Sequence, residues 1–290
     1  MRTFRSALAG APIFPGSPLP RGAAVIALLL PTFGFAAENA AAQSIPDHST
    51  FTEVLRNVVE FPRVDYERLE GQRVTLDRYM HELARTDSGE LARADREAQL
   101  AFWINAYNAC MLQLVADHYP IEARGVGMVQ WFRNMATSRP RNSVWWIRDV
   151  FDGEFCEVAG SMRSLDEIEH EIIRPRYQEP RIHFAVNCAA VSCPPLWEEA
   201  YVPEDLEAQL QRATRNFVND PAHFLLEEEP GPTLRLNRIV DWFSEDFGEE
   251  EGTKEFFAEL VDEETREILL HPDTRIEFFE YDWTLNDVDR

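Results

Sequence analysis

The stretch Phe102-Trp-Ile-Asn-Ala-Tyr-Asn-Ala-Cys-Met-Leu-Gln-Leu-Val115 decides the fold, because it is apolar on almost every side. It is the second half of a longer pattern at helical spacing, which runs from Glu90 to His118 and is ended by Pro120. A helix that is apolar all round has to be enclosed by other elements. We therefore predict a central, buried helix over residues 90–118.

Shorter patterns surround this helix. Helical spacing predicts helices at 49–60, 64–69, 75–85, 164–174, 203–217, 238–247, 253–260 and 262–270. Alternating or β-prone runs predict strands at 155–158, 161–163, 181–187, 223–226, 233–236 and 275–280. Because the strands are few and do not alternate regularly with helices, the predicted fold class is α+β: a helix-rich single domain whose central helix packs on a small antiparallel sheet. We predict that residues 121–148 form a partly helical surface lobe.

The first residues have the pattern of a leader rather than of a fold. Basic residues precede the apolar run Gly22–Leu30, and Ala40–Ala42 offers a small-residue cleavage site. This order predicts a signal peptide over 1–42, a domain over 43–290, and export to the periplasm or the extracellular space. An uncleaved anchor is the alternative, although the apolar run is short for a membrane span. No later run is long enough to span a bilayer.

The composition limits the classes of partner. The formal net charge is −23, which would repel nucleic acid and anionic membrane surfaces. No Gly-rich phosphate loop is present, so we expect no cofactor. The remaining expectation is an unknown small-molecule or peptide ligand.

The richest chemistry in the sequence lies in Arg181-Ile-His-Phe-Ala-Val-Asn-Cys-Ala-Ala-Val-Ser-Cys-Pro-Pro-Leu196. A thiol nucleophile needs its thiolate form, and a neighbouring imidazole can stabilise that form. We therefore take His183 as a candidate base and Cys193 as a candidate nucleophile. Asn187 or Glu169 would orient the imidazole.

Two other interpretations of the same residues stay open. In an oxidising compartment, Cys188 and Cys193 are the best-placed pair for a disulfide, which would make this stretch structural. Alternatively, His183, Cys188 and Cys193 with His170 offer ligand types that zinc accepts. The five-residue spacing is not typical of zinc knuckles, and our preferred prediction contains no metal.

Two pairs on helices complete the set of candidates. Glu169 and His170 invite an acid–base role, but neighbours in an α-helix project about 100° apart and would not both face a small site. Asn105 and Asn108 lie three apart on the central helix. Because buried amides are almost always paired, we expect them to hold a neighbouring loop, with a ligand-binding role as the alternative.

Several motifs together resemble the DUF547 family, a domain of unknown function. They are Phe102–Asn108, Ser164–His170 with Arg174, Arg181–Cys188, Ser192–Leu196, Leu236–Phe247 and Tyr281–Asn286. The resemblance is closest over about 91–201. It implies a distant similarity to papain-like and transglutaminase-like thiol hydrolases, in which the nucleophilic Cys starts the central helix. Here Cys110 lies in the middle of that helix, and His183 precedes Cys193.

Two functions follow as hypotheses. The first is a thiol-dependent hydrolase or acyl transferase acting on a peptide or amide. The second is a non-catalytic envelope binding or assembly module with a structural Cys188–Cys193 disulfide. The sequence does not decide whether the protein is an enzyme.

Overall fold

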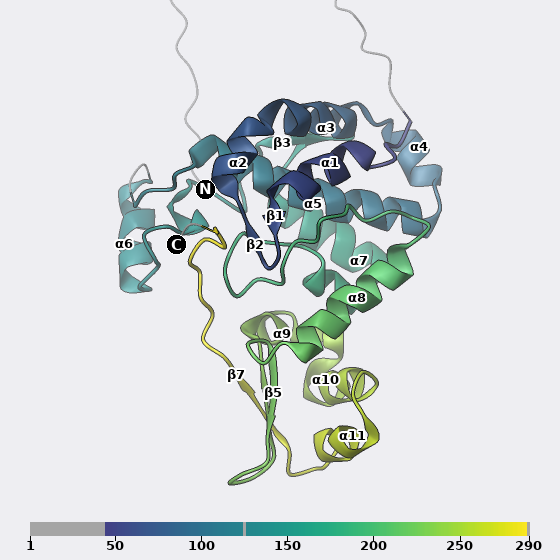
Figure 1. Ribbon diagram of the computed structural model, residues 1–290, viewed down its shortest axis with the longest axis vertical. Coiled ribbons are helices and arrows are strands. Elements are labelled where there is room, and N and C mark those ends of the chain that lie inside the picture. The colour runs from purple at the N-terminus through teal and green to yellow at the C-terminus, as the bar shows by residue number, and fades with distance from the viewer. Residues whose placement is uncertain (1–43, 124–125, 289–290) are drawn as a thin grey trace, which may run out of the picture. The chain divides into compact units, whose positions relative to one another are not determined.

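The computed structural model describes residues 44–123 and 126–288. The signal peptide predicted over 1–42 lies outside the described residues. Ala40–Arg290 form one compact unit, and within its described part the α+β prediction is confirmed: many helices pack together with three small sheets (Figure 1).

The buried helix is present but shorter than predicted. Residues 90–118 divide into α4 (Ser88–Arg93) and α5 (Arg96–His118), because Ala94 adopts an extended conformation. The side chain of Gln99 donates to the carbonyl oxygen of Ala94 at 2.7 Å, which satisfies the backbone at this break. From Leu100 onward almost every side chain of α5 is buried, as its sequence predicts.

The helices before α5 cover it through a shared apolar core. They are α1 (Ser49–Val58), α2 (Tyr66–Gly71) and α3 (Arg73–Arg85). The helix α3 packs against both α1 and α5, and its buried side chains repeat at helical spacing. Two antiparallel ribbons border this core: β1 (Val59–Glu60) with β2 (Arg63–Val64), and β3 (Cys156–Val158) with β4 (Ser161–Arg163). Burial of these apolar side chains is the main force that holds the helices together.

A disulfide joins Cys110, in the middle of α5, to Cys156 in β3. Both cysteines are buried. The covalent link closes a loop that contains α6 (Met128–Ala136) and a short 3₁₀-helix, Val144–Trp146. This part of the chain is the partly helical lobe that the sequence predicts.

A second apolar core lies under a three-stranded sheet. The hairpin β5 (Phe224–Glu227) and β6 (Thr233–Leu236) is antiparallel, as predicted, while β7 (Arg275–Phe278) pairs parallel to β6. This sheet is therefore mixed rather than purely antiparallel. The helices of this part are α8 (Leu206–Asn219), α9 (Arg238–Trp242), α10 (Glu249–Ala258) and α11 (Glu263–Leu269). Figure 1 shows these elements together in green and yellow.

The strand predicted over 181–187 is wrong. Pro180–Phe184 form a 3₁₀-helix, and the chain from Ala185 onward is irregular. Pro180 fits the first helical turn, where its missing N–H has no intrahelical partner to lose, and the Glu179 side chain accepts from the backbone N–H of Arg181 at 3.2 Å. The run is apolar because it is buried between the two cores: Ile182 belongs to the first and Phe184 to the second.

The helix predicted over 164–174 is present with a different geometry. Ser164 accepts from the backbone N–H of Glu167 at 3.0 Å, as the predicted cap requires. Glu167–Ile173 then form a π-helix, and α7 (Arg174–Tyr177) continues it past Pro175. Pro175 is tolerated because it lies at the start of the α-helical segment. Short π-helical segments are frequently found at functional sites.

After β7 the chain returns to the first core, as the yellow trace in Figure 1 shows. Val191 donates to the carbonyl of Thr284 at 2.8 Å, and Leu285 pairs antiparallel with Ala190. Tyr66 donates to the Asn286 side chain at 2.7 Å, so this return segment is tied to α2 as well. Across the described ranges, no helix combines the length and the apolar character that crossing a membrane requires.

Candidate functional site

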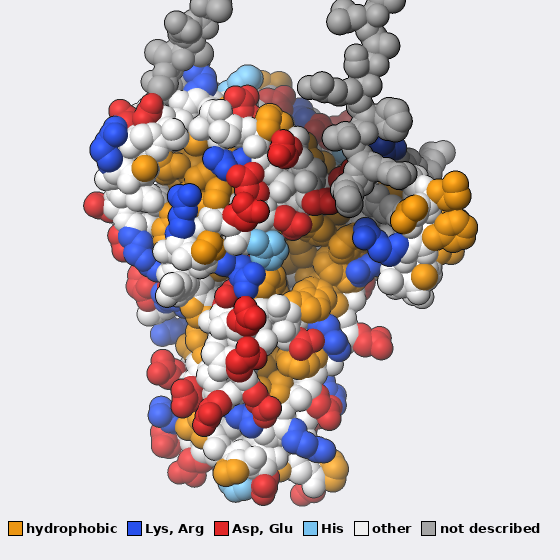
Figure 2. Space-filling view, turned by 180° about the vertical axis from the view of Figure 1, so that it is seen from behind, with side chains coloured by type: hydrophobic (Ala, Val, Ile, Leu, Met, Phe, Trp, Pro, Cys, Tyr) orange, Lys and Arg blue, Asp and Glu red, His pale blue; other side chains and the backbone are white. Residues whose placement is uncertain are grey.

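A cavity of about 490 Å³ lies where the two apolar cores meet. Its walls combine aromatic side chains with a few polar ones: Tyr107, Arg139, Trp145, Phe151, Asp166, Glu169, His170, Val186, Cys188, Cys193, Ile239, Trp242, Phe243, Tyr281 and Trp283. Figure 2 views the molecule from behind and shows hydrophobic side chains in a hollow, with a histidine and basic side chains near its edge. Concave, mostly apolar pockets with a few polar groups are typical of small-molecule and catalytic sites.

Cys188 presents its thiol to this cavity and is only half-buried. Its Sγ lies 3.2 Å from the hydroxyl of Tyr281. Hydrogen bonds from the Cys193 side chain, from Tyr281 and from the backbone of Ala190 hold the pKa of the Cys188 thiol below its usual range, although burial opposes this. A lowered pKa increases the thiolate fraction, and the thiolate is the nucleophile.

Cys193 has the opposite environment. It is buried, and its Sγ accepts from the backbone N–H of Cys188 at 2.9 Å. Burial, followed by its hydrogen bond with Cys188, raises the pKa of the Cys193 thiol well above its usual value. Of the two thiols, Cys188 is therefore the better nucleophile.

The predicted Cys188–Cys193 disulfide is wrong, because both cysteines are free and the disulfide joins Cys110 to Cys156. Closeness in sequence suggested the wrong pair. The observed pair is 46 positions apart and is brought together only by packing of β3 near α5.

Asn187 holds the loop that carries both thiols. Its side chain donates to the carbonyl of Pro194 at 2.7 Å and accepts from the N–H of Ala189 at 2.8 Å. Ala189 has a positive φ of 59°, a conformation that costs energy for a residue other than glycine. The side chain of Asn187 thus fixes the turn after Cys188 rather than orienting the imidazole of His183.

The two asparagines of α5 hold loops, as expected for buried amides. Asn108 donates to the carbonyl of Ala185 at 2.9 Å and accepts from the N–H of Asn187 at 2.8 Å. Asn105 makes the same two-way contact with the backbone of Tyr201, at 2.7 and 2.9 Å. Neither asparagine is among the lining residues of the cavity. Asn108 thus positions the start of the loop that carries Cys188 and Cys193, which we call the thiol loop.

His183 lies between two carboxylates instead of beside a thiol. Its Nε2 donates to Asp246 at 2.7 Å, and its Nδ1 is 3.6 Å from Glu169. Asp246 also accepts two hydrogen bonds from Arg174, at 2.6 and 3.1 Å. The ring of Phe243 stacks on the imidazole at 4.0 Å and itself lines the cavity, so it separates His183 from the space in front of Cys188.

This arrangement makes Asp246 an ionised partner at neutral pH. Burial raises the pKa of its carboxyl, but the hydrogen bonds from His183 and Arg174 outweigh burial and lower the pKa below its ordinary value. A carboxylate can only accept, which assigns a proton to Nε2 of His183. The geometry supports a structural link between the two cores through these charged groups.

Glu169 and His170 both line the cavity, contrary to the expectation that neighbours would diverge. They lie in the π-helix, which has more residues in each turn, so successive side chains are separated by a smaller angle. Glu169 is buried, whereas His170 is exposed and accepts from Arg174 at its Nδ1 at 3.1 Å. His170 Nε2 is 3.8 Å from Asp166. His170 thus supplies an accessible imidazole on the same cavity as Cys188.

Within the part of the chain that the structure describes, no cluster of three or more His, Cys, Asp or Glu side chains could hold a metal ion. His183, Cys188 and Cys193 do not converge, because His183 is enclosed by Glu169, Asp246 and Phe243.

Sequence reasoning missed most of the cavity wall. Tyr281 and Trp283 come from the return segment, Phe243 follows α9, and Arg139 comes from the lobe. The motifs at 236–247 and 281–286 contain the aromatic residues of this wall, but the sequence does not indicate that they share a site with Cys188. What was missing was the packing that brings these segments to Cys188.

Residues 91–218 match the family described as protein of unknown function, DUF547. The resemblance to DUF547 seen in the sequence motifs is thus confirmed over residues 91–218. The matched range contains α5, the π-helix and the thiol loop, but ends before Asp246 and Tyr281. The chain has no match among curated proteins. No solved structure matches it either. We therefore base the proposal below on the site alone.

Proposed function

We propose that this protein is an exported enzyme that uses Cys188 for covalent acyl transfer, as a thiol-dependent hydrolase or acyl transferase on peptide or amide substrates. The observation that carries the proposal is the Cys188 thiol: it is partly exposed in a cavity and hydrogen-bonded by groups that lower its pKa. A thiol with these properties is typical of reactive cysteines, whereas structural cysteines are buried and inert.

The reaction would proceed in two steps. The thiolate Sγ of Cys188 attacks the carbonyl carbon, the bond to the leaving amine breaks, and a thioester forms. Water or an acceptor amine then breaks the thioester and restores the thiol. The proton lost by the thiol passes to the leaving amine, with the imidazole of His170 as its carrier. His170 is suited to this role because it is exposed on the cavity that contains Cys188.

The neighbours of Cys188 would tune the thiolate. Tyr281 lies within hydrogen-bonding distance of its sulfur, and burial raises the pKa of the Tyr281 hydroxyl well above 10, which keeps it protonated. A protonated hydroxyl donates to a thiolate and stabilises it. Cys193 also lowers the pKa of the Cys188 thiol through a side-chain hydrogen bond, and its own raised pKa keeps it protonated.

Export is part of the proposal and has its own support. Disulfides persist in oxidising compartments and are rare in reducing ones. The Cys110–Cys156 disulfide therefore agrees with the leader predicted at residues 1–42.

An activated ester tests the proposal without knowledge of the natural substrate. The purified protein is mixed with p-nitrophenyl acetate, nitrophenolate release is followed, and the modified peptide is located by mass spectrometry. We expect an initial burst of about one equivalent of nitrophenolate with one acetyl group on Cys188. Cys188→Ser abolishes the burst, and Cys193→Ser retains acylation at Cys188.

Two further variants separate catalysis from simple thiol exposure. Tyr281→Phe removes one donor to the sulfur and lowers the acylation rate at pH 7, while higher pH restores the rate. His170→Gln slows release of the acyl group more than its formation. The proposal fails if no acetyl group is found on Cys188, or if Cys188 is acetylated no faster than the thiol of glutathione. The chain is then better described as a non-catalytic binding module.

A further inference from the structure

Part of the lobe between α5 and β3 is basic, although the protein as a whole is acidic. Residues 126–148 contain four arginines and no aspartate or glutamate, in a chain whose net charge is −23. Elsewhere many arginines are paired with carboxylates, for example Arg174 with Asp246 and Arg181 with Glu207. This segment therefore carries a net positive charge, and one of its arginines lines the cavity of Cys188.

Arg139 is this cavity residue, and aromatic rings hold it. Its guanidinium carbon lies 4.5 Å from the centre of the Trp145 ring and 4.6 Å from that of Trp283. Both indoles line the cavity, and Trp145 packs edge-on against Trp283 at 5.2 Å. Cation–π contacts of this kind fix the guanidinium plane and leave its edge, with the N–H donors, available to a ligand.

Among the described residues, no side chain accepts a hydrogen bond from the guanidinium of Arg139 or pairs with it as a carboxylate within 4.0 Å. Burial, and then the like charge of Arg133, lower the pKa of Arg139 below its ordinary value, which is the direction expected for a cation without a close anion. An arginine remains protonated even so. A partly buried cation without an anionic partner is costly, and an anion from outside would relieve that cost.

The rest of the cavity limits where such an anion can lie. Asp166 and Glu169 are also in the wall, and they would repel a second negative charge. A ligand would therefore place its anionic end at Arg139 and its neutral portion against the aromatic rings and Cys188. The guanidinium fork matches the two oxygens of a carboxylate.

We propose that Arg139 binds a carboxylate group of the substrate, so that the site selects amides that carry a carboxylate near the bond attacked by Cys188. This inference rests on the proposed function only in treating the bound carboxylate as part of a substrate. The affinity of Arg139 for a carboxylate does not depend on catalysis and is tested separately.

Two thiol reagents of nearly equal size make the test, because iodoacetate carries a carboxylate and iodoacetamide does not. The rate of alkylation at Cys188 is measured for each reagent by peptide mass spectrometry, and the ratio of the two rates is compared between proteins. Arg139→Gln should lower the iodoacetate-to-iodoacetamide ratio by roughly three- to tenfold, the effect of one cation in the same partly solvated cavity. Arg139→Lys, which keeps the charge, should retain most of the preference.

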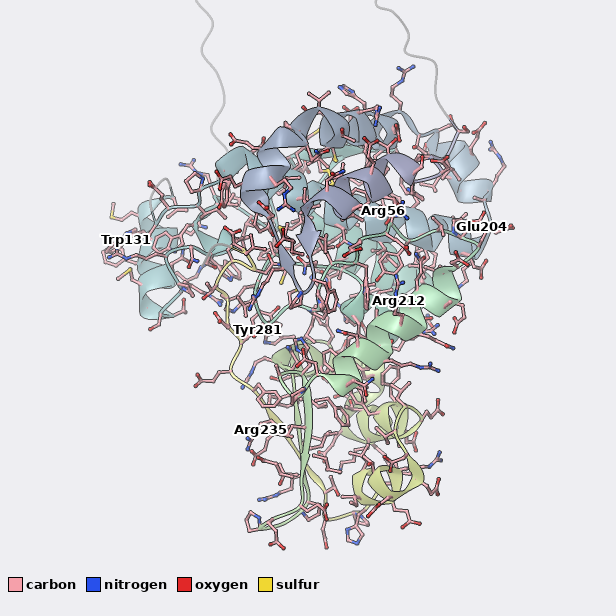
Figure 3. The ribbon with its side chains drawn as sticks, viewed as in Figure 1. Arg56, Trp131, Glu204, Arg212, Arg235 and Tyr281 are labelled. Atoms are coloured by element: carbon pink, nitrogen blue, oxygen red, sulfur yellow. A yellow bond between two sulfur atoms is a disulfide. The ribbon has the colours of Figure 1, made fainter. Side chains whose placement is uncertain are left out.

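Arg212→Gln is the matched control. Arg212 also stacks on an indole, with its guanidinium carbon 4.4 Å from the Trp197 ring, but neither residue lines this cavity. Figure 3 labels Arg212 on α8 and Tyr281 on the return segment. This variant should leave the ratio unchanged.

The ratio of the two alkylation rates distinguishes failure of this inference from failure of the proposed function. If Arg139→Gln has the same ratio as the wild-type protein, while circular dichroism shows a folded chain, carboxylate binding by Arg139 is refuted. If Cys188 reacts slowly with both reagents, the proposed function fails, yet the ratio still reports on Arg139. A ratio that falls equally in Arg212→Gln would show a general charge effect and would also overturn the inference.

Discussion

The Cys110–Cys156 disulfide should contribute a large share of the stability of this protein. It joins residues 46 positions apart, and it connects the buried helix α5 to the ribbon that contains β3. In the chain-entropy model, closing a loop of that length restricts the unfolded chain by about 4 kcal/mol at 25 °C. Replacing both cysteines by alanine should therefore lower the free energy of unfolding by about 4 kcal/mol.

Urea unfolding followed by circular dichroism measures this difference at fixed pH without reductant. The midpoint should fall strongly in Cys110→Ala/Cys156→Ala, while Cys188→Ala, which removes a thiol but no cross-link, should cost about 1 kcal/mol. The slope m should rise in the double variant, because its unfolded chain is less compact.

A thiol count gives an independent check. The wild-type protein, denatured without reductant, should expose the thiols of Cys188 and Cys193 only, and reduction should add those of Cys110 and Cys156. A loss of less than about 1 kcal/mol in the double variant would contradict the loop-closure reasoning. Four reactive thiols before reduction would contradict the disulfide itself.

Two further predictions concern the groups behind the site. Asn108→Ala leaves the backbone of Ala185 and Asn187 unpaired in the core and should cost about 3 kcal/mol in urea unfolding, whereas the exposed Asn57→Ala should cost less than about 0.5 kcal/mol. Asp246 has a lowered pKa in the folded state, so its stabilisation is complete above its unfolded pKa of about 4 and is lost as the pH falls below that value. Asp246→Asn should be less stable by about 2 kcal/mol at pH 7 and should lose less stability between pH 5 and pH 2; an acid-unfolding slope equal to wild type would contradict this assignment.

The sequence predicted the parts of the fold that depend on local periodicity. The apolar positions of α1, α3 and α8 repeat at helical spacing, and those helices lie within a few residues of their predicted bounds. The hairpins β3–β4 and β5–β6 were predicted from short β-prone runs separated by turns. In these segments the local preference and the packing agree.

The run at 181–187 failed because an apolar sequence indicates burial without specifying strand or helix. Its backbone is held by side chains from other elements, chiefly Asn108 on α5, which no local pattern contains. The π-helix at 167–173 likewise could not be predicted from local periodicity, and its wider turn brings Glu169 and His170 closer to one face.

The cysteines singled out in the sequence do line a cavity, but assigning a role to each of them required distances. Cys188 and Cys193 are alike in sequence, and only the structure separates a partly exposed thiol of lowered pKa from a buried one of raised pKa. Arg139 and Tyr281 lie 49 and 93 positions from Cys188, so their contribution could not be predicted from spacing.

The return segment after β7 has a consequence for the order in which the site can form. A ribosome makes Tyr281 long after Cys188, and the hydroxyl beside the sulfur is absent until that late stage. Trp283, which packs on Arg139, arrives with it. A growing chain that has emerged only as far as β7 would carry an incomplete cavity and an untuned thiol. The cavity around Cys188 is therefore complete only once the return segment has packed against the rest of the described domain.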